Sequence, residues 1–74
     1  MSTKRYQREL KAFGIKLKQL REERGLIQLD LEIKSDINRT EISKIENGKK
    51  NIEFYTIVKL AEALNVEIAN FFEK

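Results

Sequence analysis

The chain of 74 residues contains no cysteine and no histidine. The absence of cysteine excludes disulfide bridges and thiol nucleophiles, and the absence of both residue types excludes the usual ligand sets of structural zinc sites. A domain of this length buries only about 60% of the surface that its unfolded chain exposes. Its stability therefore has to come from apolar packing, to which self-association can add.

The sequence also lacks long hydrophobic runs. No apolar stretch approaches the roughly 18 residues that a membrane span requires. The N-terminal segment MSTKRYQREL is basic but lacks the apolar stretch that follows in a secretory signal. We therefore expect a cytoplasmic protein that makes no membrane contact, and the lack of cysteine fits such a reducing compartment.

The net charge is only +3, but the charges are unevenly distributed. Residues 1–24 carry eight Lys or Arg and three Glu, and residues 39–50 carry four Lys or Arg and two Glu. The stretches 25–38 and 51–74 each contain more acidic than basic residues. A basic zone of this kind favours a polyanionic partner on one face of the molecule.

Proline is absent and only three glycines occur, so few residues interrupt helical structure. The first predicted helix follows from apolar residues spaced three and four apart. These residues are Tyr6, Leu10, Phe13, Leu17 and Leu20. Gly25 offers a left-handed stop after Arg24. Residues 1–11 are expected to extend this helix into solvent rather than to bind DNA. Their basic side chains are Lys4, Arg5, Arg8 and Lys11.

Four shorter helices are expected in the remainder of the chain, at residues 28–34, 39–47, 54–64 and 68–72. Asn38 is suited to cap the third helix by accepting from the backbone N–H of Glu41, and Gly48 ends that helix. No strand pattern is found. The sequence therefore predicts one all-α domain, residues 1–74, built as a compact five-helix bundle.

The second and third predicted helices are joined by a turn of about four residues, which allows them to cross at a steep angle. Apolar residues suited to fill the wedge between them are Leu31, Ile37, Ile42 and Ile45. This arrangement is the helix-turn-helix, whose second helix fits the major groove of DNA. With the isoleucines facing inward, the third helix presents a polar reading face, which consists of Arg39, Thr40, Ser43 and Lys44.

Several stretches together carry a resemblance to a known family. They are LREERG at the end of the first helix, Gln28 at the start of the second, RTEISKIENG in the third and LAEALNV in the fourth. Over about residues 16–72 the chain resembles the helix-turn-helix domain of Cro and the phage repressors, the XRE family. The resemblance implies the phage-repressor type of fold and DNA binding through the third, recognition helix.

The resemblance also implies roles for individual residues. Gln28 matches a glutamine that contacts phosphate and braces the recognition helix. Arg21 and Glu46 match a pair that forms a salt bridge between the first and third helices, with Arg21 also within reach of phosphate. Positions that face base edges are matched by Arg39, Thr40 and Lys44. Positions that clamp the DNA backbone are matched by Asn38, Asn47, Lys49 and Lys50.

The side-chain chemistry agrees with these roles. Arg39 can donate two hydrogen bonds to guanine, a contact worth roughly 1–3 kcal/mol of discrimination. Lys44 can reach guanine or a phosphate. Lys49 and Lys50 are better suited to phosphates, where they add affinity without sequence information.

Two phenylalanines, Phe71 and Phe72, stand near the end of this small domain. One ring fits a core of this size, whereas burying both within the monomer is harder. We therefore predict a homodimer whose interface includes Val66, Ile68 and Phe72. The alternative is that both rings complete the monomer core.

The function predicted from the sequence is specific binding to double-stranded DNA as a homodimer, which regulates transcription from a roughly palindromic operator. The alternative is an antitoxin-like protein-interaction module in which DNA binding is secondary. An enzyme is not expected, because His and Cys are absent and no phosphate-binding glycine loop or paired carboxylates are found. No cofactor, metal or small-molecule ligand is expected. A phage repressor, a restriction–modification controller and an antitoxin all remain open as roles.

Overall fold

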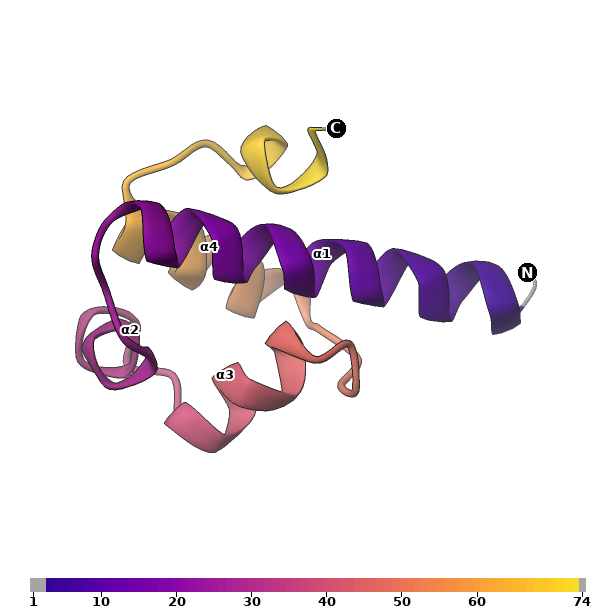
Figure 1. Cartoon of the computed structure of the whole chain (residues 1–74), viewed down its shortest axis with the longest axis horizontal. Helices are drawn as coiled ribbons and strands as arrows, with labels where there is room; N and C mark the ends of the chain where they lie inside the picture. Colours follow the sequence, from indigo (N-terminus) through magenta and orange to yellow (C-terminus); the bar gives the residue numbers. More distant parts are fainter. Residues whose placement is uncertain (1–2, 74) are drawn as a thin grey trace.

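The computed structural model describes residues 3–73 (Figure 1). Over this range the chain forms four α-helices and one 3-10 helix, and no strand. The elements are α1 (Thr3–Glu23), α2 (Gln28–Ser35), α3 (Arg39–Glu46), α4 (Phe54–Leu64) and η1 (Ile68–Phe72). The all-α prediction is therefore confirmed.

The prediction of a five-helix bundle is wrong in its last element. The segment η1 is a 3-10 helix of five residues, in which the N–H of Asn70 donates to the carbonyl of Glu67 at 2.9 Å. That bond spans three residues, as 3-10 geometry requires, and such helices are short because their hydrogen bonds are less well aligned than those of an α-helix. The described chain is therefore a bundle of four α-helices with a short C-terminal turn.

The longest helix, α1, runs along the length of the molecule, and other elements pack on two of its sides (Figure 1). It packs against α3 on one side and against η1 on the other, while α2 packs against both α3 and α4. The N-terminal turns of α1 project beyond the other helices (Figure 1). For this reason Tyr6 and Leu10 are only half-buried, although they continue the apolar stripe of the helix.

The hydrophobic core lies between α1, the helix pair α2–α3, α4 and η1. Every described element contributes at least one buried apolar side chain to it. The buried apolar residues are Phe13, Leu17, Leu20, Leu31, Ile37, Ile42, Ile45, Leu60, Ala61, Leu64 and Phe71. The residues expected to fill the wedge between the second and third helices all belong to this set, so that part of the sequence-based prediction is confirmed.

The connection between α2 and α3 is built around Ser35 and Asp36. The buried Ser35 hydroxyl donates to the carbonyl of Leu31 at 2.6 Å and accepts from the N–H of Ile37 at 3.2 Å. Asp36 adopts the left-handed conformation, with φ of 59°, which Asp tolerates better than most residues. These contacts reverse the chain within a few residues and direct Ile37 into the core between the two helices.

The backbones of α1 and α3 lie close together at Gly14, which is buried. A Cβ atom at this position would lie 2.6 Å from the carbonyl oxygen of Glu46, and would also clash with the carbonyl of Ile45. A glycine inside a helix costs roughly 1 kcal/mol relative to alanine. Here that cost allows the backbone at the end of α3 to rest directly on α1.

We predict that Gly14→Ala destabilises the protein, although alanine is the better helix former. The added methyl group has to push the backbone of α3 away from α1, and overpacking of this kind costs roughly 1–3 kcal/mol. Urea denaturation followed by circular dichroism measures the change in the free energy of unfolding. A variant as stable as the natural protein would show that α3 can move away from α1 at no cost.

Candidate nucleic-acid interface

The N-terminus of α3 is capped by Asn38. Its side-chain oxygen accepts from the N–H of Thr40 at 2.7 Å, which satisfies one of the free donors at the start of the helix. The bond predicted from the sequence, with the N–H of Glu41 as donor, is therefore wrong. The backbone of Asn38, with φ of −54° and ψ of 136°, brings its side chain to the second N–H of the helix and not to the third.

The C-terminus of α3 lies one residue earlier than predicted. The helix ends at Glu46, and Asn47 follows as the C-cap. The side-chain amide of Asn47 donates to the carbonyl of Ser43 at 2.8 Å, and so closes the last turn. At eight residues, α3 is about 12 Å long, which is short enough to lie within one stretch of major groove.

A buried ion pair holds α3 against α1. The Arg21 Nε donates to Oε2 of Glu46 at 2.7 Å and Nη2 donates to Oε1 at 3.0 Å, so the pair is bidentate. The two side chains are only 8% and 2% exposed. From α2, the side-chain amide of Gln28 also donates to Oε1 of Glu46, at 3.1 Å. The carboxylate of Glu46 therefore connects three helices at one point.

All three nitrogens of the Arg21 guanidinium donate to acceptors within the protein. Its remaining terminal nitrogen, Nη1, donates to the carbonyl of Leu26 at 2.7 Å. The side-chain hydrogen bond to Glu46 raises the pKa of Arg21, while burial acts in the opposite direction. Because the pKa of Arg21 is raised in the folded protein, the stability that its charge contributes is present at neutral pH and is lost only as the pH rises through that pKa. Arg21 is therefore charged at any physiological pH.

The reading face predicted from the sequence lies together in the structure. Arg39, Thr40 and Lys44 are exposed and Ser43 is half-buried. These four side chains and Gln28 line one open hollow of about 390 Å³ between the start of α2 and α3. No acidic residue is among those that line it. On the opposite side of α3, Ile42 and Ile45 are completely buried, so the rotation of the helix about its axis is fixed.

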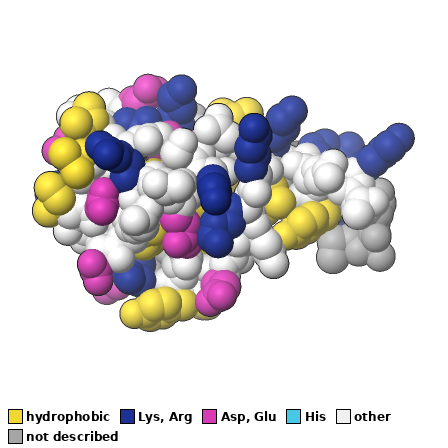
Figure 2. All heavy atoms as spheres, turned by 90° about the horizontal axis from the view of Figure 1, so that it is seen from below, with side chains coloured by type: hydrophobic (Ala, Val, Ile, Leu, Met, Phe, Trp, Pro, Cys, Tyr) yellow, Lys and Arg dark blue, Asp and Glu magenta, His cyan; other side chains and the backbone are white. Residues whose placement is uncertain are grey.

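The residues that the resemblance assigned to the DNA backbone lie outside this hollow: Asn47 and Lys49 line a second hollow, and Lys50 lines a third together with Glu41 and Glu53. Asn38 lies at the start of α3, and the other three follow the helix in sequence; of these, Asn47 and Lys49 are exposed and Lys50 is half-buried. The face on the α3 side carries Lys and Arg side chains over its centre and out to the projecting N-terminal end of α1 (Figure 2). Acidic side chains lie among them on the same face (Figure 2). The basic side chains expected from the sequence therefore share this face, without forming an unbroken patch.

The two C-terminal phenylalanines have different environments. Phe71 is buried, with its ring centroid 4.9 Å from that of Phe13. Phe72 is 62% exposed, although its ring centroid lies 5.8 Å from that of Phe13. A few residues earlier in the chain, Val66 and Ile68 are half-buried. The alternative that both rings complete the monomer core is therefore wrong, and an apolar surface is left around Phe72.

Within residues 3–73, no helix combines the length and the apolar character that a membrane span requires. The 21-residue α1 is long enough, but Lys and Arg residues occur throughout it.

Comparison with known proteins agrees with this geometry. The control protein C.MunI from Mycoplasma sp is 38% identical over 61 residues, which span 81% of this chain and 82% of that protein. The crystal structure of the restriction-modification controller protein C.AhdI from Aeromonas hydrophila superposes with a TM-score of 0.83, at 36% identity. That match covers 85% of this chain and 96% of C.AhdI.

A third similar protein was crystallised with DNA. The restriction-modification controller protein C.Esp1396I, as a tetramer in complex with its natural 35 base-pair operator, matches with a TM-score of 0.80 and 30% identity over 97% of this chain and 88% of that one. The sequence profile of the helix-turn-helix family matches residues 17–71. The chain therefore belongs to the helix-turn-helix family of the Cro and phage-repressor (XRE) type, a family of DNA-binding transcription regulators.

Proposed function

We propose that this protein binds a specific double-stranded DNA operator as a homodimer and regulates transcription there, with α3 in the major groove. The observation that carries the proposal is the reading face, whose side chains, three exposed and one half-buried, line one hollow on a helix of fixed rotation. Base edges in the major groove present donors and acceptors to side chains of this type. Phosphates on either side are attracted by the basic residues around the hollow.

Each residue of the reading face has a role in this proposal. Arg39 donates to guanine O6 and N7, and Lys44 reaches either a guanine or a phosphate. Thr40 offers its hydroxyl to several bases or its methyl group to thymine, and Ser43 offers a hydroxyl from the floor of the hollow. These four side chains account for sequence discrimination.

Other residues bind phosphates or hold α3 in place. The proposed phosphate contacts are made by Gln28, Asn38, Asn47, Lys49 and Lys50, which fix the position of the protein on the duplex without reading sequence. We assign Arg21 to positioning α3 through Glu46, because its side chain is only 8% exposed. A phosphate contact by Arg21, which the resemblance allowed, is not part of the proposal.

The proposed dimer interface is the apolar surface around Phe72, with Val66 and Ile68 at its edge. An open hollow of about 320 Å³ is lined by Phe13, Phe71 and Phe72, with Ala12, Glu9 and Glu73, and offers the Phe72 ring of a second copy a place to insert. In a two-fold dimer the two insertions would be equivalent. Two copies of α3 related by this symmetry would enter successive major grooves about 34 Å apart. A roughly palindromic operator follows from that geometry.

The names of the similar proteins favour one of the roles that the sequence left open. C.MunI is a control protein, and C.AhdI and C.Esp1396I are restriction-modification controllers. We propose that this chain is likewise a controller of a restriction–modification operon and not a phage repressor or an antitoxin.

Selection of bound duplexes from a randomised DNA library, at a fixed salt concentration, tests the proposed function. We expect enrichment of one roughly palindromic site, because two identical reading faces contact it. Folded protein that enriches no motif would contradict the proposal, and the protein-interaction alternative would then replace it.

We predict that Arg39→Gln relaxes base preference at one symmetric pair of operator positions. The loss of a bidentate contact to guanine should reduce discrimination there by roughly 1–3 kcal/mol, as measured by competition between operator duplexes that differ at single positions. Lys49→Gln serves as the matched control, because loss of a phosphate contact should weaken all duplexes by a similar factor. Equal loss of discrimination in both variants would refute the assignment of Arg39 to base reading.

We predict that Phe72→Ser weakens the dimer. Complete burial of a phenylalanine is worth about 1.5–3 kcal/mol, and each dimer loses two rings. Sedimentation velocity over a range of protein concentrations measures the shift towards monomer. Phe54→Ser is the control, since Phe54 is similarly exposed, at 67%, but lies at the start of α4. A natural protein that is monomeric at high concentration, both free and on DNA, would exclude this interface.

A further inference from the structure

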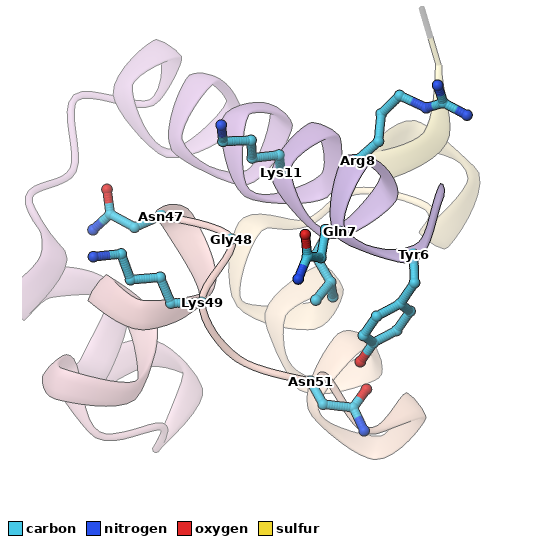
Figure 3. Close-up of a pocket in the computed structure, with 9 residues that line it drawn as sticks. Tyr6, Gln7, Arg8, Lys11, Asn47, Gly48, Lys49 and Asn51 are labelled. Carbon is cyan, nitrogen blue, oxygen red and sulfur yellow. The ribbon is translucent and has the colours of Figure 1, made fainter. Parts of the chain in front are cut away.

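The N-terminal half of α1 and the loop after α3 border an open hollow of about 840 Å³ (Figure 3). Three of the side chains that line it are cationic, those of Arg8, Lys11 and Lys49, and none is acidic. A neighbouring hollow further along α1 contains Lys18, but its lining also includes Glu22, Glu23 and Glu46. Only the first of these two hollows therefore has an uncompensated positive charge that suits an anion.

Backbone contact holds Lys11 beside the end of α3. After α3 the chain adopts the left-handed conformation at Gly48, whose φ is 68°. The N–H of Gly48 donates to the carbonyl of Ile45 at 3.0 Å, and the N–H of Lys49 donates to the carbonyl of Lys44 at 2.9 Å. This is the Schellman closure, which favours glycine. The Cβ that Gly48 lacks would lie 3.0 Å from Cα of Lys11, so the two segments touch at this point.

The side chains around this contact differ in direction. Those of Lys11, Asn47 and Lys49 point to the same side of the hollow, whereas that of Arg8 points away from them (Figure 3). Two polar groups in the proposed DNA interface, Asn47 and Lys49, are thus joined by a third from a helix that lies more than 30 residues earlier in the sequence. The segment after α3 carries Asn47 and Lys49, and α1 carries Lys11.

We propose that Lys11 binds a DNA phosphate together with Asn47 and Lys49, so that the N-terminal part of α1 belongs to the DNA interface. This inference rests on the proposed function. The C-terminal end of a helix carries partial negative charge, which by itself repels a phosphate near the end of α3. Lys11 and Lys49 offset that repulsion from two sides. The expectation that the N-terminal basic residues only extend a solvated helix is revised for Lys11.

The test compares Lys11→Gln with Arg8→Gln, which removes the same charge from a side chain of the same hollow that points away from Asn47 and Lys49. Affinity for the selected operator and for a duplex of random sequence is measured by fluorescence anisotropy between about 50 and 200 mM KCl, a range over which phosphate contacts change affinity strongly. Lys11→Arg keeps the charge. Thermal unfolding of each variant reports any loss of stability.

For Lys11→Gln we expect the salt dependence of log K to fall in magnitude by about 0.9, the value for one phosphate contact on duplex DNA. The ratio of natural to variant affinity should then change about 3.5-fold across this fourfold range of salt. Both duplexes should be weakened by the same factor, because a phosphate contact carries no sequence information. Lys11→Arg should restore binding, and Arg8→Gln should keep the natural slope.

Equal changes of slope in Lys11→Gln and Arg8→Gln would overturn the proposal, since general charge and not a local contact would then explain them. An unchanged slope in Lys11→Gln, with operator binding intact, would overturn it as well. Either result leaves the proposed function standing. Failure of the natural protein to bind any duplex would overturn both.

Discussion

The buried ion pair between Arg21 and Glu46 is the interaction on which the position of α3 depends. It connects the longest helix to the last turn of α3, and Gln28 extends it to α2. Removal of two charges from water offsets most of their attraction, so such a pair adds little net stability. Loss of one partner alone leaves an uncompensated buried charge and costs roughly 3–5 kcal/mol. We infer that the pair serves mainly to define one position for α3.

Two further contacts act with the ion pair. Gly14 sets the distance between α1 and α3, because no side chain separates the backbones there. Ile42 and Ile45 set the rotation of α3, because both are completely buried. The direction of the reading face is therefore determined by contacts on the inner side of the helix. Gly48 has a similar effect. Because it has no side chain, Lys11 of α1 can lie against the loop that carries Lys49. The positions of the side chains that we propose to contact DNA thus depend on residues on the inner side of the helices.

Local patterns made much of this predictable from the sequence. The spacing of apolar residues predicted the α-helices, and Gly25 and Gly48 marked the ends of α1 and α3, because left-handed positions favour glycine. The polar side of α3 followed from the isoleucines opposite. The hydrogen-bond partner of Asn38 was missed, since neighbouring N–H groups differ only in fine backbone geometry.

Contacts between distant segments could not be predicted in this way. Helix propensity alone counts Gly14 only as destabilising, because the carbonyls that require a glycine there belong to α3. Arg24 donates to the carbonyl of Leu64, 40 residues away, at 2.7 Å, and no local pattern indicates that bond. The same holds for Lys11, whose place beside Lys49 depends on how α1 packs.

We infer that the inner contacts of α3 control how the reading face recognises DNA. The most direct test is the affinity of the Glu46→Gln variant for the operator, relative to its affinity for a duplex of random sequence. Removal of a negative charge should by itself strengthen binding to DNA. We predict instead that preference for the operator falls while the variant remains folded. An unchanged preference with tighter binding to both duplexes would contradict this account.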